Sequence, residues 1–301
     1  MATPGRTEPP VMSTVAVLGA GAVGARVARQ LLTSDVVEQV VLRDISAERL
    51  ARASRALGNR CRVEHHPFPG ALEADLVVVA TPRGTHLEAV NETIAARRPA
   101  VLVGDGLAET IAVLRRSGDA ARAGVPIAVG SGFGPGMSCV LAAHGASWFD
   151  EVDEVHVAKA GTGGPACALV HHRALSRRSY DWRVDDGSRT GDWVRRAGGS
   201  GRELAWFPDP VGPRDCYRAA LPDPVLLHHA LPTVGRITAR VAATRRDRLT
   251  APLPMLSPPH VEGGTGAVRV EVRGRRGEAS DVVVLGATER PAVAAAAVAA
   301  T

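Results

Sequence analysis

The sequence reads Val15-Ala16-Val17-Leu18-Gly19-Ala20-Gly21-Ala22-Val23-Gly24 near its N-terminal end. A short apolar run enters the pattern G-x-G-x-x-G, and a stretch with helical character, 22–32, follows it. In a strand-turn-helix unit of this kind, Gly19 permits a tight turn and Gly21 lets the backbone approach a diphosphate. Gly24 lets the helix pack closely on the strand. The pattern therefore predicts a dinucleotide-binding unit.

The residues around this turn predict how the dinucleotide is held. The helix directs its N-terminal amides, beginning at Ala22 and Val23, toward the phosphates. Asp44 ends the apolar run 40–44, 20 residues after the third glycine, where a carboxylate can accept hydrogen bonds from an adenosine ribose. That carboxylate would repel a 2′-phosphate, so we expect NAD(P) binding with NAD favoured. Arg43 beside it leaves NADP open.

Size and composition are those of a globular protein. The chain has 301 residues and 31.3 kDa, with 45% hydrophobic and 22% charged residues, which is enough for two domains. The net charge of +5 and the pI near 9.5 do not indicate nucleic acid, because the arginines are scattered among acids. The four cysteines lie far apart without a C-x-x-C pair, which argues against a zinc site and a disulfide framework. We expect a cytoplasmic protein without a membrane partner.

Strand and helix patterns alternate through the first half. Apolar runs at 14–18, 39–43, 76–80, 100–103 and 126–129 have the pattern of buried parallel strands, with helical stretches near 22–32, 47–57, 85–97 and 107–122 between them. Ser46 is the expected N-cap of the second helix and Gly58 its expected end. The prediction is an α/β fold, a Rossmann-type doubly wound parallel sheet over residues 13–131.

The pattern changes after about residue 149, where a second α+β domain on a mixed sheet is expected over 132–280. Residues 152–158 alternate as a strand, which puts Val155, Val157 and Lys159 on one face. Residues 267–273 alternate in the same way, and 176–203 has the composition of a loop. A helix is predicted from 224 toward 243, with a break near Pro232. Residues 281–301 form a closing strand and helix that can dock back on the Rossmann domain. The proline-rich start, 1–12, is expected to be a disordered arm.

Three segments together resemble the saccharopine dehydrogenase/reductase-like family of NAD(P)-binding oxidoreductases. They are the glycine fingerprint, the segment Ala123–Ser138 with its Gly132-Phe133-Gly134-Pro135-Gly136, and the closing pair 268–274 and 282–286 with the alanine-rich helix after it. The resemblance implies a Rossmann domain with a mixed-sheet substrate domain. It also implies hydride transfer between a nicotinamide and an imine or amine (CH–NH) of an amino-acid-like substrate.

One segment resembles a different group of enzymes. Ala80–His86 is closer to sugar- and inositol-dehydrogenase-like proteins, which carry Glu-Lys-Pro after the fifth strand. Here the equivalent stretch is Val103-Gly104-Asp105-Gly106, without a lysine. An alcohol or sugar dehydrogenase is therefore one alternative to the imine reaction. The other is an NAD(P)-binding regulatory or partner protein without turnover.

Several cofactor-binding and substrate-binding residues are expected at the carboxyl edge of the sheet. Thr81 and Pro82 follow the strand 76–80 and can touch the cofactor, unless Pro82 is simply the first residue of a helix. Asp105 follows the next strand and can bind a substrate amine or cap a helix. Gly134 belongs to a junction whose free amides can face the cofactor.

Three side chains are candidates for the catalytic group. Lys159 is the single lysine among 36 basic residues, and unlike arginine a desolvated lysine can exchange a proton near neutrality. His171 and His172 follow the glycine-rich loop 161–164, and histidine is suited to proton transfer. Adjacent residues of a helix do not share a face, so one of the two histidines at most should point into the cleft. We also expect a small-molecule substrate and a homodimer.

Overall fold

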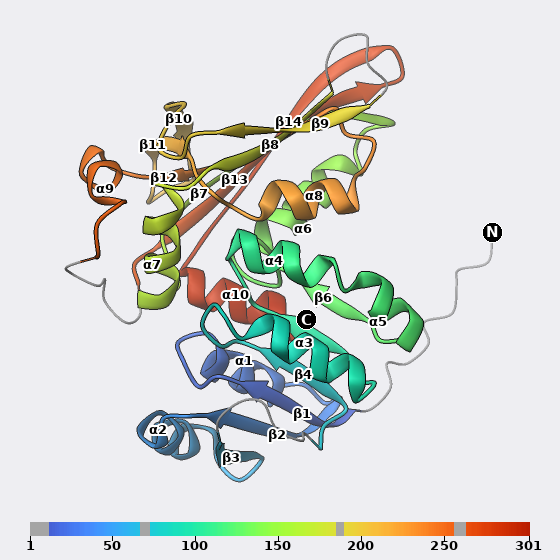
Figure 1. Ribbon diagram of the computed structural model, residues 1–301, viewed down its shortest axis with the longest axis vertical. Coiled ribbons are helices and arrows are strands. Elements are labelled where there is room, and N and C mark those ends of the chain that lie inside the picture. The colour runs from blue at the N-terminus through green and yellow to red at the C-terminus, as the bar shows by residue number, and fades with distance from the viewer. Residues whose placement is uncertain (1–11, 67–72, 185–189, 256–262) are drawn as a thin grey trace.

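The computed structural model describes residues 12–66, 73–184, 190–255 and 263–301 (Figure 1). The expected N-terminal arm, 1–12, lies outside the described residues except for Met12, which begins the first strand. The described chain forms two sheets, with helices between them and on their outer faces (Figure 1). Within these residues there is no helix long and apolar enough to cross a membrane.

The first sheet is parallel and has six strands in the order β3-β2-β1-β4-β5-β6. Its strands are β1 (Met12–Leu18), β2 (Val37–Asp44), β3 (Cys61–His65), β4 (Leu76–Val79), β5 (Ala100–Leu102) and β6 (Ile127–Val129). Its helices are α1 (Gly24–Leu31), α2 (Ala47–Leu57), α3 (His86–Ala95), α4 (Leu107–Leu114) and α5 (Ser117–Ala123). The five predicted strands are confirmed, and β3 is an addition that the sequence analysis missed.

Alternate residues of each strand fill two separate cores. Val15 and Val17 of β1 face α1 and α2, while Ala16 and Leu18 face α3 and α4. Both faces are buried, which explains why these strands read as continuous apolar runs. Ser46 caps α2 by accepting a hydrogen bond from the Arg49 amide, and the helix ends at Gly58, as predicted.

The second sheet is mixed and has eight strands, of which the main path runs β10-β11-β12-β7-β13-β14, with β8 joined to β12 and β9 joined to β8. Its strands are β7 (Glu151–Ala160), β8 (Ser179–Val184), β9 (Gly191–Arg196), β10 (Glu203–Trp206), β11 (Pro213–Arg218), β12 (Arg236–Ala242), β13 (Gly266–Arg276) and β14 (Ala279–Glu289). The accompanying helices are α6 (Met137–Ala146), α7 (Pro165–Ala174), α8 (Asp223–Ala230), α9 (Arg245–Thr250) and α10 (Pro291–Ala300). The fold class is thus the predicted one.

Two predictions for the second half were wrong. The segment 176–203 is a hairpin, β8–β9, rather than loop, and Trp182 and Trp193 lie directly opposite each other in it with ring centroids 5.2 Å apart. Such a cross-strand aromatic pair stabilises a hairpin that is otherwise rich in arginine and glycine. The predicted helix 224–243 ends at Ala230, before Pro232, and the chain then forms strand β12. Ile237, Ala239 and Val241 are buried at every second position, the period of a strand.

The two halves of the molecule meet through the last helix and the helices under the second sheet. In Figure 1, α6, α8 and α10 lie between the two sheets. Ala296 and Ala299 of α10 belong to the same core as Val27 and Leu31 of α1. Of the closing elements 281–301, the helix therefore packs on the Rossmann unit, whereas β14 pairs with β13 in the second sheet.

Candidate functional site

A cleft of about 510 Å³ lies at the carboxyl edge of the parallel sheet, where the two halves of the molecule face each other. Its walls are the glycine loop after β1, Asp44 at the end of β2, the loops after β4 and β5, the segment 132–135, the start of α7 and two residues of α10. Parallel α/β sheets place their ligands at this edge, outside the carboxyl ends of the strands. The cleft is therefore the candidate site.

Each of the three glycines of the fingerprint is suited to its position for a different structural reason. Gly19 has a φ of +98°, and a Cβ there would lie 2.7 Å from the Ala80 carbonyl oxygen. A Cβ at Gly24 would lie 1.8 Å from the Gly19 carbonyl oxygen, so this glycine is needed for packing, and it does not line the cleft. A Cβ at Gly21 would meet no atom within 4 Å, and Gly21 borders the cleft. The space that Gly21 leaves open is where a diphosphate can approach the backbone.

The start of α1 and Asp44 complete this end of the cleft. The N-cap residue of α1, Val23, makes no side-chain cap, and the first turn has no acidic residue. Asp44 is held in place by two backbone amides, since Ala20 N–H donates to Oδ2 and Ser46 N–H donates to Oδ1, each at 2.7 Å. Arg43 turns away from the cleft and pairs with Glu64 on β3, with Nη2–Oε2 at 2.6 Å.

The loop after β4 brings Thr81 and Pro82 to the cleft wall. Thr81 is fixed by a hydroxyl–hydroxyl hydrogen bond to Thr85 of 2.6 Å, and its carbonyl oxygen lies 2.9 Å from Nε2 of His86. Pro82 is not the first residue of a helix, because α3 begins at His86 after an N-cap at Thr85. The helix-start interpretation of Pro82 is therefore wrong.

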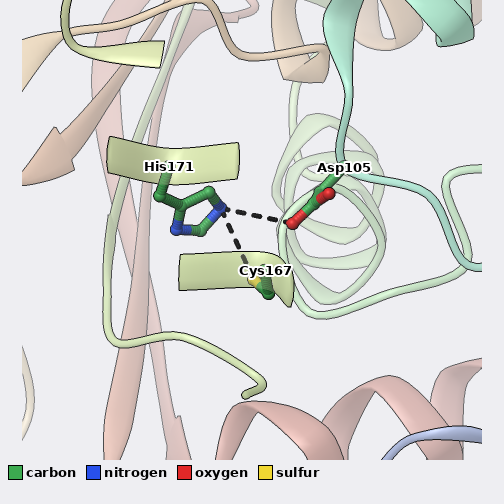
Figure 2. Close-up of side chains that lie close together, drawn as sticks. All are labelled: Asp105, Cys167 and His171. Carbon is green, nitrogen blue, oxygen red and sulfur yellow. Dashed lines mark hydrogen bonds and ion pairs between the residues drawn. The ribbon is translucent and has the colours of Figure 1, made fainter. Parts of the chain in front are cut away.

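Asp105, Cys167 and His171 come together at the cleft wall under the second sheet. Figure 2 shows Asp105 and Cys167 on the same side of the His171 ring, with both marked contacts at the same ring nitrogen. Nε2 of His171 is 3.6 Å from Oδ2 of Asp105 and 3.8 Å from Sγ of Cys167. The Asp105 carboxyl oxygen and the Cys167 sulfur also lie within 4.8 Å of each other. All three residues line the cleft.

Burial favours the neutral form of each of these three groups. Desolvation raises the pKa of Asp105 above its ordinary value, although the neighbouring Cys167 thiol and the charge of Lys159 oppose this. Desolvation and the Asp105 carboxyl raise the pKa of the Cys167 thiol well above its ordinary value. Desolvation, helped by Lys159, lowers the pKa of His171 well below its ordinary value. The expected alternative that Asp105 caps a helix is wrong, since Gly106 is the N-cap of α4 and no side chain caps it.

The other two catalytic candidates lie outside the cleft. The side chain of Lys159 is 0% exposed, and its Nζ donates to the Gly134 carbonyl oxygen and lies 3.7 Å from Oδ2 of Asp223. It contacts the 132–135 segment from the side away from the cleft and does not line the cleft as a catalytic group would. Nε2 of His172 is 2.9 Å from the Thr250 carbonyl oxygen, so the expectation that His172 is catalytic is not supported. As predicted from helix geometry, one of the two adjacent histidines faces the cleft.

The sequence analysis did not find that Cys167 belongs to the site. The signal was present as Cys167-x-x-x-His171, because residues four apart on a helix lie on one face. Asp105 could not be joined to this pair, since 62 residues separate it from Cys167 and only the packing of α7 over the β5 loop brings them together.

Comparison with known proteins agrees with this geometry. Residues 13–130 match the GFO/IDH/MocA model, described as "Oxidoreductase family, NAD-binding Rossmann fold". This part of the chain is an NAD(P)-binding Rossmann domain. The resemblance noted from the sequence was to another family with the same kind of domain. None of the curated proteins compared with the sequence matches it.

Several solved structures are similar to nearly the whole chain. The saccharopine dehydrogenase (L-Glu forming) of Saccharomyces cerevisiae is 12% identical, with a TM-score of 0.62, over 96% of this chain and 88% of that one. GenD2 of gentamicin A biosynthesis, solved with NAD, is 16% identical with a TM-score of 0.48, over 99% and 86% of the two chains. A myo-inositol dehydrogenase of Corynebacterium glutamicum is 12% identical with a TM-score of 0.48, over 91% and 74%. At these identities the similarity concerns the fold.

Proposed function

We propose that the protein is an NAD-dependent oxidoreductase whose reaction takes place in the cleft between the Rossmann domain and the mixed sheet. The observation that carries the proposal is that the glycine loop, Asp44 and the Asp105–Cys167–His171 group all line one cleft. Asp44 ends β2 and Asp105 follows β5, three strand intervals away in the sheet order. At about 4.8 Å per interval the separation is roughly 14 Å, which suits an extended dinucleotide.

The residues of the cleft fit this cofactor. Gly21 leaves its side of the loop open for the diphosphate, and the uncapped amides at Ala22 and Val23 can bind it. Asp44 is proposed to accept the hydroxyls of the adenosine ribose. Because Arg43 is engaged with Glu64, NAD is proposed over NADP. Thr81, Pro82 and Gly134 line the same cleft beyond the glycine loop. A bound nicotinamide supplies or accepts a hydride there.

The proposed reaction interconverts an imine and an amine (CH–NH) of an amino-acid-like substrate. In the reducing direction the carbon of the C=N bond receives the hydride and the nitrogen gains a proton, so the products are an amine and the oxidised cofactor. His171 is the catalytic candidate that faces the substrate space, and Asp105 lies beside it. The fold of the yeast saccharopine dehydrogenase, which matches over nearly the whole chain, supports this choice.

The second candidate reaction is oxidation of a CH–OH group, as suggested by the segment Ala80–His86. A lysine-based mechanism has no residue to use here, because the single lysine, Lys159, is 0% exposed and does not line the cleft. This observation favours the CH–NH reaction.

Cofactor binding and turnover test the proposal in two steps. Calorimetric titration of the folded protein with NADH and NADPH should show binding, with NADH preferred. NADH oxidation is then measured with 2-oxo acids plus amino acids, and NAD reduction with polyols. His171→Gln should abolish turnover while the matched neighbour His172→Gln, whose side chain faces Thr250, retains it. A folded protein that binds neither nucleotide would refute the proposal.

A further inference from the structure

The Asp105–Cys167–His171 group has the arrangement of three ligands around one point. Oδ2 of Asp105 and Sγ of Cys167 both approach Nε2 of His171, and all three ligand atoms lie within 4.8 Å of one another. In a proton relay the carboxylate would bind one ring nitrogen and the thiol the other. Here Nδ1 of His171 is buried and makes no hydrogen bond within the described residues. The geometry is therefore convergent, with both contacts at one nitrogen (Figure 2).

The separations are close to those of a tetrahedral zinc site. Zinc bonds of about 2.0–2.1 Å to nitrogen and oxygen and about 2.3 Å to sulfur place neighbouring tetrahedral ligands roughly 3.3–3.6 Å apart. The observed separations are 3.6 Å between His171 and Asp105 and 3.8 Å between His171 and Cys167. The two separations from His171 would therefore need a contraction of a few tenths of an ångström to match one ion, and the Asp105 and Cys167 ligand atoms lie within 4.8 Å of each other. Cys167 and His171 are four residues apart on α7, so one helix face carries two of the ligands.

The charges of the surroundings permit a divalent ion. Asp105 and Cys167 as anions carry two negative charges, which a divalent cation neutralises, while His171 binds as the neutral imidazole. Lys159 is the nearby cation, and its charge is balanced by Asp223 at 3.7 Å.

We propose that Asp105, Cys167 and His171 bind a zinc-class divalent metal ion whose fourth position faces the cleft. A carboxylate, a thiolate and an imidazole together suit zinc better than magnesium or calcium. Three protein ligands with one open position are typical of a catalytic ion rather than of a structural one. The open position takes an oxygen or nitrogen lone pair of the substrate. This last part rests on the proposed function, because it requires that the substrate occupies the same cleft, and in it His171 serves the reaction as a ligand of the ion and not as a proton donor.

The test uses the full chain without an affinity tag, stripped with a chelator and titrated with Co²⁺ and then Zn²⁺. One Co²⁺ per chain should bind and give a thiolate-to-cobalt charge-transfer band. Cys167→Ser should remove the band and weaken zinc binding by about 100-fold or more, beyond the loss typical for outer partners of a site. Two control variants should bind the ion as the unchanged protein does. One is Cys139→Ser, which replaces a thiol of α6 outside the cleft wall, and the other is His172→Gln.

The outcomes separate this inference from the proposed function. If Co²⁺ gives no charge-transfer band, or if Cys167→Ser keeps it, the metal site is refuted whether or not NADH binds. If the ion binds as described but neither nucleotide does, the metal site stands and the proposed function fails. Addition of a 2-oxo acid or an amino acid should alter the visible cobalt bands. Unchanged bands at saturating turnover substrate would refute the substrate-facing position.

Discussion

Gly21→Ala offers the sharpest test of the cofactor assignment, because it separates binding from folding. A Cβ at Gly21 meets nothing within 4 Å, and the residue does not have a left-handed φ. Alanine should therefore be accepted by the fold. Its lower freedom in the unfolded chain should even raise the free energy of unfolding by about 0.4–1 kcal/mol.

The same methyl group should harm cofactor binding. Gly21 borders the cleft, and the added carbon occupies the side from which a diphosphate approaches the backbone. Loss of one hydrogen bond to a charged phosphate oxygen corresponds to about 1.5–3 kcal/mol. We therefore expect NADH affinity to fall by roughly 10- to 150-fold, measured by calorimetry, while the melting temperature is unchanged or slightly higher.

Two other glycines provide the controls. Gly264→Ala also places a Cβ in open space without a left-handed φ, but outside the cleft wall, and it should leave the NADH affinity unchanged. Gly24→Ala should lower the melting temperature, because its Cβ would lie 1.8 Å from the Gly19 carbonyl oxygen. Unchanged NADH affinity in Gly21→Ala would show that the diphosphate does not lie against this loop.

Three further predictions follow from buried charges. Asp44→Ala should weaken NADH binding by roughly tenfold or more and lower the NADH-over-NADPH preference; an unchanged ratio of the two dissociation constants would contradict the ribose contact. Lys159→Met should lower the free energy of unfolding by about 3–5 kcal/mol, because Asp223 is left buried without a counter-charge, and adding Asp223→Asn should recover most of the loss in denaturant titrations. Lys159→Arg with unchanged turnover and stability would show that neither proton exchange nor the buried ion pair with Asp223 requires a lysine at this position. Burial opposes the charge of Glu271, but hydrogen bonds from the arginines on either side lower its pKa below the ordinary 4.5. The stabilisation that the charged Glu271 contributes is therefore present above pH 4.5 and is lost as the pH falls through the lowered pKa. Glu271→Gln should lower the free energy of unfolding by about 1 kcal/mol at pH 7 and by less in acid. A difference in the free energy of unfolding that does not change with pH would contradict this prediction.

The sequence determined those features that depend on neighbouring residues. The turn at Gly19 and the cap at Ser46 are set by backbone sterics and by hydrogen bonds within four residues, and both are visible as local patterns. The buried parallel strands were also predictable, since a sheet covered on both faces requires continuous apolar runs. The period of two in 152–158 correctly placed Val155, Val157 and Lys159 on one buried face of β7.

Only the tertiary structure decided which side chains share the cleft. Asp105 comes from the loop after β5, while Cys167 and His171 come from α7, and their meeting depends on how the second sheet packs over the first. Lys159 was placed on the correct face, but whether that face meets the cleft or lies behind the 132–135 segment is a property of packing. Strand β12 was missed for a related reason. Ile237, Ala239 and Val241 alternate as in a strand, but Arg240 between them is half-buried because its charge is paired with Glu203 across the sheet, a contact that no local pattern contains.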